Sequence, residues 1–382
     1  MPKKSKEKAT DQSKIDAKYQ LQLTPAIGSP LHNWLANVLA FGPPSLRYLH
    51  RVIIVAFVSF VGFPFRWYES WKLKVKLSTT RLHGDPVFII GHWRSGTTLI
   101  HNLMAKDPQF GSISMYQALF PRSFITSKFF GWFLKWVMPD ERPMDKMKLD
   151  VSMPQEDELA MSNMHRFSMY NGWHFPWRLM DFYRRWVEFE GVSDEGRERW
   201  WREYHQLLKR TTLANGRKRI ISKNPPHTAR IEGLLKRYPN ARFIHLYRNP
   251  YKIFLSTRNL YRKAVPPFTT QKYSVEKQDR DFMDIYVRMM KKFYATEHLI
   301  PKGQLVHVRF EDMEKDIVGT LERIYSELDL DGFEKARPIF QDYVDSLSSY
   351  QKNKFTMSEE DIKLVQEKWG FTLDHWGYDI PD

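Results

Sequence analysis

The stretch PVFIIGHWRSGTTLIHNLM, residues 86–104, decides the fold of this 382-residue chain. Its first five residues are all apolar, which is typical of a buried strand in a parallel sheet. Its last eight residues, TTLIHNLM, predict a helix. The loop between them, residues 91–96, has a glycine at each end. A strand, a glycine-containing loop and a helix in this order indicate an α/β domain.

The same loop is suited to binding a phosphate-like anion. Backbone N–H groups of such a loop converge with the helix N-terminus, where the helix dipole favours negative charge. The candidate anion-binding residues are Arg94, Ser95, Gly96, Thr97 and Thr98. The glycine allows close backbone approach, the hydroxyls donate hydrogen bonds and the arginine adds charge. The glycine spacing mimics a nucleoside-triphosphatase loop, but a threonine occupies the position of its lysine.

Further apolar runs alternate with helical patterns along the chain. Strands are expected at residues 219–222, 241–246 and 304–309, and helices at 228–238, from Asn249-Pro250 onward, and through 321–328. This alternation predicts a three-layer, P-loop-like α/β domain with a central parallel sheet. Residues 110–215, rich in tryptophan, phenylalanine, methionine and arginine, are expected to form a helical insertion that could build an acceptor pocket.

The strand predicted at 241–246 leads into Arg248, where an ATPase would need an aspartate to hold magnesium. An arginine cannot bind magnesium, but its guanidinium forks well onto a phosphate. The residues therefore indicate two phosphate sites and no metal site.

Two of these segments resemble the sulfotransferases. Residues 86–103 are similar to their 5′-phosphosulfate-binding loop, in the branch that has Arg-Ser-Gly-Thr-Thr. Residues 243–256 are similar to their 3′-phosphate motif, and Arg248 and Ser256 fall on its two anion-binding positions. The resemblance extends to residues 153–158, 223–227 and 310–312, and so covers roughly residues 85–355.

This resemblance implies PAPS (3′-phosphoadenosine 5′-phosphosulfate) as the donor, without a metal. Leu99 departs from the cytosolic enzymes, which place an adenine-stacking tryptophan after the two threonines. Residues 350–356, YQKNKFT, resemble a late motif near the 3′-phosphate but lack its glycines, and make Lys352 a weaker candidate.

Sulfuryl transfer requires a base that takes the acceptor's proton and positive charge that neutralises the leaving phosphate. The candidates are Glu156, Glu158, His227 and Lys223, with His92 below them. The resemblance favours Glu156 as the base, because it falls in the Pro-x-Glu segment of this branch. Lys223 would assist charge neutralisation. Asp312 is expected to be structural, bonding loop amides.

The N-terminal region differs in character from the rest of the chain. Residues 1–18 are predicted to be a disordered basic tail without the features of a signal peptide, and residues 19–81 a helical segment. Residues 82–382 would form the catalytic domain. The apolar run at 52–65 is shorter than a membrane span, and basic residues flank it on both sides. A helix buried against the domain, an interfacial membrane helix and, least favoured, a true span are the three alternatives for it.

The net charge is +15, and the chain has no cysteine, which excludes disulfides and thiolate sites. Residues 1–81 hold 13 Lys and Arg against 4 Asp and Glu. We therefore expect attraction to anionic lipid headgroups, a cytoplasmic protein with peripheral membrane contact through residues 47–76, and no nucleic-acid partner. The expected acceptor is a hydroxyl of a hydrophobic molecule such as a lipid or sterol. A glycan acceptor, a nucleotide kinase and a basic nucleic-acid-binding protein are the alternatives.

Overall fold

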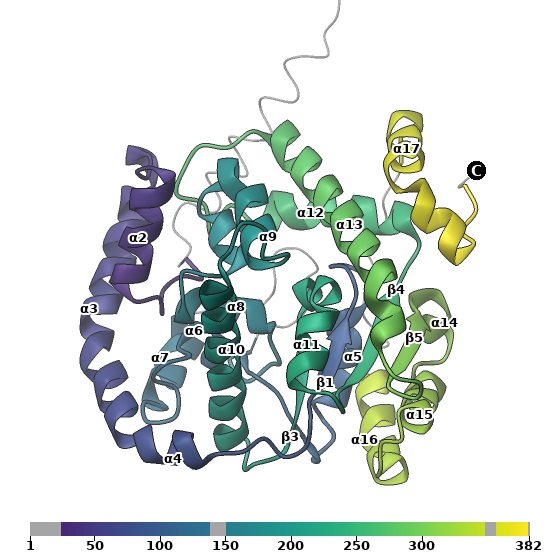
Figure 1. Cartoon of the computed structure of the whole chain (residues 1–382), viewed down its shortest axis with the longest axis horizontal. Coiled ribbons are helices and arrows are strands. Elements are labelled where there is room, and N and C mark those ends of the chain that lie inside the picture. The colour runs from purple at the N-terminus through teal and green to yellow at the C-terminus, as the bar shows by residue number, and fades with distance from the viewer. Residues whose placement is uncertain (1–23, 138–149, 348–356, 381–382) are drawn as a thin grey trace, which may run out of the picture.

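The computed structural model describes residues 24–137, 150–347 and 357–380. At its centre lies a five-stranded sheet in the order β2-β3-β1-β4-β5, and every neighbouring pair is parallel (Figure 1). The strands are β1 (Val87–Ile90), β2 (Phe110–Gly111), β3 (Arg219–Lys223), β4 (Arg242–Tyr247) and β5 (Leu305–Arg309). The predicted α/β fold with a central parallel sheet is confirmed.

Both faces of the sheet are buried, as a continuous apolar strand requires. Val87 and Ile89 of β1 point into one apolar cluster, and Phe88 and Ile90 point into another on the opposite face. The four residues are fully buried. Successive side chains of a strand point to opposite faces, so one four-residue strand serves both cores.

Helices cover the two faces and complete the three layers. One face packs against α5 (Thr97–Met104), α14 (Phe310–Lys315), α15 (Ile317–Glu327) and α16 (Phe333–Ser346). The other packs against α10 (Asp194–Ala214), α11 (Ile231–Arg237), α12 (Pro250–Ala264), α13 (Val275–Thr296) and α17 (Glu359–Trp376). The predicted helices at 97–104, after Asn249 and through 321–328 correspond to α5, α12 and α15.

The region between β1 and β3 is mostly helical, as expected. It contains α6 (Met115–Leu119), α7 (Phe129–Val137), α8 (Asp157–Met164), α9 (Leu179–Trp186) and α10, with the 3₁₀ turns η3 (Met169–Trp173) and η4 (Pro176–Arg178). Strand β2, with only two residues, was not predicted, because a pair of residues carries no periodic signal.

The prediction of a helix at 228–238 is wrong about where the helix begins. Residues Pro225–Ala229 form a 3₁₀ turn, η5, and the α-helix begins only at Ile231. Two consecutive prolines open the turn, and Arg230 between the two elements has a φ of −116°, outside the helical region. A last 3₁₀ turn, η6 (Glu297–Leu299), precedes β5.

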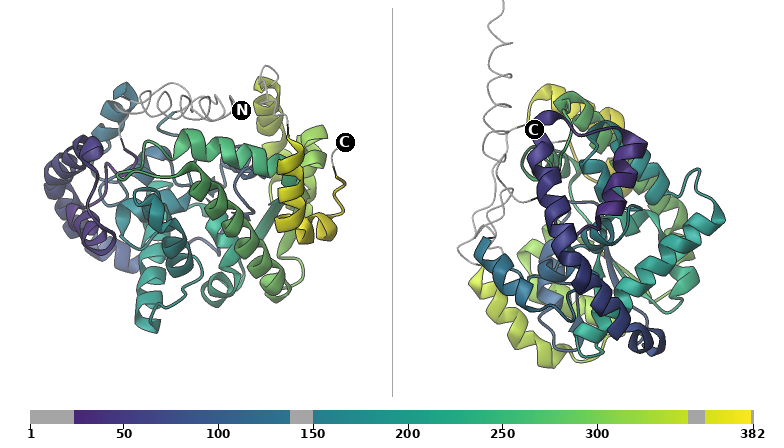
Figure 2. Two further views of the ribbon diagram at one scale, coloured as in Figure 1. Left: turned by 90° about the horizontal axis from the view of Figure 1, so that it is seen from above. Right: turned by 90° about the vertical axis from the view of Figure 1, so that its left-hand side faces the viewer.

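The N-terminal segment forms α2 (Leu31–Phe41), the turn η2 (Leu46–Tyr48), α3 (Leu49–Lys72) and α4 (Lys74–Thr79), which lie along one side of the domain (Figures 1 and 2). Among the described residues, Leu46–Lys72 is the helical stretch long and apolar enough to cross a membrane, judged by length and composition. The predicted tail at residues 1–18 lies outside the described residues.

Buried polar bonds fix α3 to the domain at both ends. The Arg51 guanidinium donates to the carbonyl oxygens of Pro266 (2.5 Å) and Thr269 (2.7 Å). The carboxylate of Glu69, which is fully buried, forms an ion pair with Arg210 of α10 at 2.5 Å. The two residues are 18 apart, which is five helical turns, so both face the domain.

Candidate active site

Three residues of the 91–96 loop have a backbone conformation in the left-handed region, which favours glycine. Gly91, Arg94 and Gly96 all adopt positive φ, at 129°, 72° and 102°. A side chain on Gly91 would place a Cβ 2.3 Å from the Leu246 carbonyl oxygen, and one on Gly96 would meet the Phe310 ring at 2.4 Å. Both glycines are therefore required by close packing as well as by conformation.

Both predicted phosphate motifs meet at this loop. Arg94 Nε donates to the Ser256 hydroxyl at 2.8 Å, although 162 positions separate them in the chain. Arg248, at the end of β4, donates through Nη1 to the Arg94 carbonyl oxygen at 3.2 Å and stacks over the Phe310 ring at 4.1 Å. Parallel strands β1 and β4 end at the same edge of the sheet, which brings these residues together.

These residues fit a ligand that carries two phosphates. Arg248 is largely buried, burial lowers its pKa from the usual value, and its Nε has no hydrogen-bond partner in the described structure. A buried guanidinium N–H without a partner is costly unless an anion completes its bonds. The tight glycine cradle of the loop could hold a second anion. Ser95, Thr97 and Thr98 follow in the loop and the first turn of α5, and the Ser95 hydroxyl donates to the His92 carbonyl oxygen at 2.7 Å.

Glu156 and Lys223 lie beside this loop as an ion pair, with Nζ and Oε1 2.6 Å apart. Glu156 is the N-cap of α8, and Lys223 is the last residue of β3, next to β1. Their side chains are 15% and 3% exposed. A carboxylate held next to an ammonium and close to an anion site can accept a proton while the ammonium neutralises negative charge.

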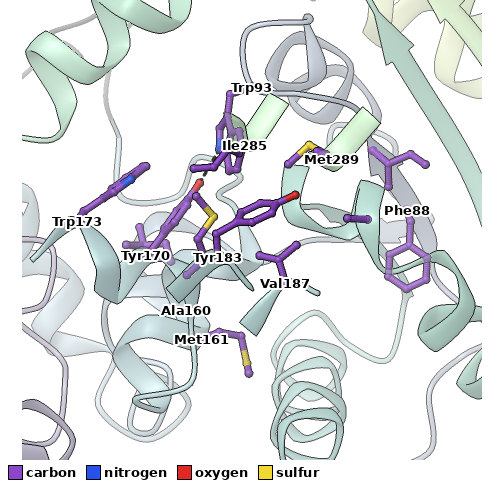
Figure 3. Close-up of a cluster of buried hydrophobic side chains, with 14 of the residues drawn as sticks. Phe88, Trp93, Ala160, Met161, Tyr170, Trp173, Tyr183, Val187, Ile285 and Met289 are labelled. Atoms are coloured by element: carbon purple, nitrogen blue, oxygen red, sulfur yellow. Dashed lines mark hydrogen bonds between the residues drawn. The ribbon is translucent and has the colours of Figure 1, made fainter. Parts of the chain in front are cut away.

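Tyr170 connects Glu156 to the loop, and sequence reasoning missed it. Its hydroxyl donates to Glu156 Oε2 and accepts from Trp93 Nε1 at 2.9 Å (Figure 3). The ring stacks on Trp173, with centroids 4.2 Å apart. Burial, and then the Glu156 charge, raise the pKa of Tyr170 well above its usual value, so the hydroxyl keeps its proton. No motif indicated this residue, since its two partners lie 77 and 14 positions away.

Glu158 belongs to the core rather than to this site. It forms a fully buried ion pair with Arg230 at 2.9 Å. Its other oxygen accepts from the Ser168 hydroxyl at 2.8 Å and the Met169 amide at 3.0 Å. Because these bonds satisfy both oxygens, Glu158 holds α8, η3 and the segment after η5 together.

His227, one of the candidates from the sequence, is also part of the core. Its ring packs edge-on against Phe88 and Tyr204, and the residue is fully buried. Burial, with a contribution from Arg230, lowers its pKa well below the usual value. His92 is buried in the same way, and burial lowers its pKa to about 3.

The expectation for Asp312 is wrong, because its neighbour performs that role. The carboxylate of Glu311 accepts from the Asn249 amide at 3.0 Å and from the Tyr378 hydroxyl at 2.8 Å. Asp312 is exposed and lies 3.8 Å from Lys315. Lys352 lies outside the described residues.

Asp157, between the two glutamates, was not singled out from the sequence. It accepts hydrogen bonds from the hydroxyls of Tyr204 (2.8 Å) and Ser222 (2.5 Å). It is buried, and burial raises its pKa to about 6 against the opposing effect of these two hydroxyls. The three consecutive acidic residues of this segment therefore have three different environments.

Comparison with known proteins finds relatives along most of the chain. A model of the sulfotransferase family matches residues 86–335. The chain is 30% identical over 330 residues to an omega-hydroxy-beta-dihydromenaquinone-9 sulfotransferase, Stf3, of Mycobacterium bovis, and equally to that of Mycobacterium tuberculosis. The alignments cover 86% of this chain and 84% of the relative.

Two solved structures share the fold. The sulfotransferase STF9 of Mycobacterium avium has a TM-score of 0.66 at 19% identity, over 98% of this chain and 97% of that one. The sulfotransferase STF1 of Mycobacterium tuberculosis has a TM-score of 0.63 at 18% identity, over 88% and 90%. The family match over residues 86–335 and the 30% identity to Stf3 over 330 residues show that the chain belongs to the sulfotransferase family.

Proposed function

We propose that the protein transfers the sulfuryl group of PAPS to a hydroxyl of a hydrophobic, lipid-like acceptor. The observation that carries the proposal is the convergence of Arg94, Ser256 and Arg248 at one sheet edge, with the Glu156–Lys223 pair beside them. Two arginine-containing anion positions fit a donor that has two separate phosphates. PAPS, when bound, would supply the activated sulfuryl group.

The chain's own residues would act on the two ends of the transfer. Glu156 would take the proton of the acceptor hydroxyl while Tyr170 and Lys223 hold its carboxylate in position. Lys223 and Arg94 would neutralise the negative charge that develops on the leaving phosphate. We assign Glu156 rather than Glu158 or His227 as the base, because the latter two are completely buried in core contacts.

Support for an apolar acceptor comes from the surroundings of the base. Tyr170, which contacts Glu156, stacks on Trp173, and Trp173 packs edge-on against Phe268 at 4.9 Å. A 30% identical relative is named for a menaquinone derivative, a lipid with an ω-hydroxyl. A glycan, by contrast, would need a polar groove beside the base.

The decisive experiment uses labelled PAPS with separate lipid and glycan pools. We expect label in the lipid pool, and none with the Glu156→Gln protein as control. Label confined to the glycans would overturn the lipid assignment. In calorimetry, adenosine 3′,5′-bisphosphate should bind and ATP should not compete. Preferential ATP binding would overturn the donor assignment.

We further propose that α3 contacts the membrane surface. Its inward face buries the polar residues Arg51, Ser59 and Glu69 together with Val55, whereas its outward face is apolar. The exposed large side chains include Ile53, Phe57, Phe60, Phe63, Trp67 and Trp71, each more than half exposed. On a helix that covers a soluble core, the exposed face is polar instead.

The charges that flank this face fit an anionic bilayer. Lys72, Lys74 and Lys76 are exposed immediately after the aromatic residues. A span surrounded by lipid would have to detach Arg51 and Glu69 from their buried partners, so an interfacial position, in which one face keeps the protein contacts, is favoured.

Cosedimentation with anionic vesicles tests this contact. The wild-type protein should bind, and Phe57→Ser/Phe60→Ser should bind at least tenfold more weakly while remaining folded. Equal binding by both proteins would contradict the proposal. Concentration-dependent dimerisation that the same substitutions abolish, without vesicle binding, would instead assign the face to a second copy of the chain.

A further inference from the structure

A groove of about 670 Å³ lies between α2, α3, the C-terminal end of α8 and α10. Its cationic lining residues are Arg66, Arg122, Arg166 and Arg199. One of its edges is formed by the exposed aromatic side chains Phe60, Phe63 and Trp67 of α3. The view onto α2 and α3 shows this side of the molecule (Figure 2, right). The groove therefore joins a cluster of positive charge to the apolar face of α3.

The positive charge of the groove is largely uncompensated within the described residues. Glu203 is the one acidic residue in its lining, and it pairs with Arg122 at 3.0 Å. Arg66 donates to the Ser59 carbonyl oxygen at 2.6 Å, a neutral partner. Arg166 and Arg199 are both exposed and lie near the Phe167 ring, at 5.0 and 5.4 Å, without an ion pair to a described carboxylate.

A buried imidazole in the lining also lacks a partner. His165 follows the last turn of α8, is 5% exposed, and its Nδ1 has no hydrogen-bond partner in the described structure. Burial lowers its pKa to about 3, helped by the positive charges of Arg199 and Arg122. The imidazole is therefore neutral, chiefly because it is buried. An anion in the groove would relieve both the missing hydrogen bond and the charge repulsion.

We infer that this groove binds the phosphate headgroup of an anionic membrane lipid. Arginine forks bind phosphate oxygens in pairs, and Arg166 and Arg199 are the accessible forks of this lining. A phosphate bound there would lie next to Phe60, Phe63 and Trp67, which line the same groove. These side chains would then enter the acyl region of the same leaflet. The inference rests on the proposed membrane contact of α3, but not on sulfuryl transfer.

The groove is separate from the candidate active site. Glu156 caps the N-terminus of α8, and His165 follows its C-terminus. The eight residues of this helix span roughly 12 Å at 1.5 Å per residue. The lining shares no residue with the Arg94, Ser256 and Arg248 cluster. Loss of lipid binding and loss of donor binding can therefore be measured independently.

The test compares two charge-matched double variants on vesicles of phosphatidylcholine alone or mixed with phosphatidylglycerol. Arg166→Gln/Arg199→Gln removes two groove arginines, and Lys74→Gln/Lys76→Gln removes two exposed lysines just beyond α3. Diffuse attraction contributes roughly 1 kcal/mol per cation, so the lysine variant should bind the mixed vesicles about 30-fold more weakly. If the groove is a headgroup site, the arginine variant should lose more than about 100-fold, since each hydrogen bond to a charged phosphate contributes roughly 1.5–3 kcal/mol. Equal losses would indicate diffuse attraction and overturn the inference.

Competition by inorganic phosphate distinguishes a lipid headgroup from free phosphate as the ligand of the groove. If a lipid headgroup is the ligand, inorganic phosphate should weaken binding to mixed vesicles only slightly. It should have no effect on the residual vesicle binding of the groove variant. Phosphate that binds the groove tightly, with vesicle binding unchanged in the groove variant, would overturn the lipid assignment. Calorimetry with adenosine 3′,5′-bisphosphate should be unchanged in the groove variant, so a failure of the donor assignment would be recognised separately.

Discussion

Lys223 Nζ lies 2.6 Å from Glu156 Oε1, an ion pair that joins the end of β3 to the beginning of α8. The second oxygen of Glu156 accepts a hydrogen bond from Tyr170, which contacts the 91–96 loop at Trp93. The carboxylate is thus fixed beside the loop from two directions. Glu158, two positions later, points into the core and pairs with Arg230. Two glutamates only two positions apart thus have different surroundings, one beside the loop and one in the core.

The first prediction separates these two glutamates. Glu156→Gln should lower turnover by a factor of about 10² to 10⁴, because the amide cannot take the acceptor's proton. Its affinity for adenosine 3′,5′-bisphosphate should stay within about twofold of wild type, since Arg94 and Arg248, which we propose bind the phosphates, are untouched. Steady-state kinetics and calorimetry measure the two quantities.

Glu158→Gln is the matched control. It leaves Arg230 buried without a countercharge, which should cost roughly 3–5 kcal/mol of unfolding free energy. Urea denaturation should therefore show a large loss of stability for this variant and little for Glu156→Gln. A fully active Glu156→Gln enzyme would exclude Glu156 as the base.

A second prediction concerns Tyr170→Phe. The substitution keeps the stacking on Trp173 but removes the hydroxyl that holds Glu156. A carboxylate with fewer donors binds a proton more tightly. The acidic limb of the rate profile should therefore move to higher pH, with little change in the KM for the donor. An unchanged profile would mean that Tyr170 only fills space.

A third prediction tests the two arginines that we propose bind the donor phosphates. Arg94→Ala and Arg248→Ala should each weaken binding of adenosine 3′,5′-bisphosphate by at least tenfold, because a hydrogen bond to a charged group contributes roughly 1.5–3 kcal/mol. Arg202→Ala, an exposed arginine of α10, is the control and should bind normally. If both site variants keep wild-type affinity in calorimetry, the donor site lies elsewhere.

Local patterns were enough to predict the part of the site that strands and loops define. The predicted boundaries of the strand, loop and helix at 86–104 agree with the structure to within a residue. Arg248 and Ser256 lie beside the loop, as their positions after β4 suggested. These features follow from short-range sequence and from the geometry of parallel strands.

The contacts that distinguish one side chain from its neighbour could not be predicted. Nothing in the sequence near Glu156 and Glu158 indicates which of them faces the loop, because the answer depends on Lys223 and Arg230, about 70 positions away. His227 is buried because Tyr204 of α10 packs over it. Such tertiary partners leave no periodic signal in the chain.

A fourth prediction follows from Asp157, whose pKa burial raises to about 6. In the unfolded chain the carboxyl titrates near 4, so between pH 4 and 6 the folded state binds more protons. The contribution of Asp157 to the free energy of unfolding is therefore highest at low pH and falls as pH rises through 6. The difference of about two between the two pKa values corresponds to roughly 3 kcal/mol.

Asp157→Asn removes this dependence, because the amide carries no charge and its oxygen can still accept from Tyr204 and Ser222. Relative to wild type, the variant should gain roughly 3 kcal/mol of unfolding free energy between pH 4 and pH 7 in urea denaturation. The comparison cancels the other titrating groups. A stability difference that does not vary with pH would show that the carboxyl is ionised throughout this range.

The last prediction concerns the attachment of α3. Glu69 pairs with Arg210 at 2.5 Å, and its second oxygen accepts from the amides of Ile125 and Thr126 at 2.9 and 2.8 Å. Burial lowers the pKa of Arg210, and the Glu69 charge opposes this effect. The ion pair is thus the main buried polar link between the C-terminal half of α3 and the domain.

Arg210→Met should leave the Glu69 carboxylate buried without its cation, at a cost of roughly 3–5 kcal/mol. Glu69→Gln should cost a similar amount. The double variant should be less destabilised than the sum of the two, because neither charge is then left alone, and the coupling should be about 1–3 kcal/mol. If α3 is held by this pair, limited proteolysis should cleave α3 faster in each single variant than in the double variant. Additive losses, with equal cleavage in all three, would mean that Arg51 and the apolar contacts alone hold the helix in place.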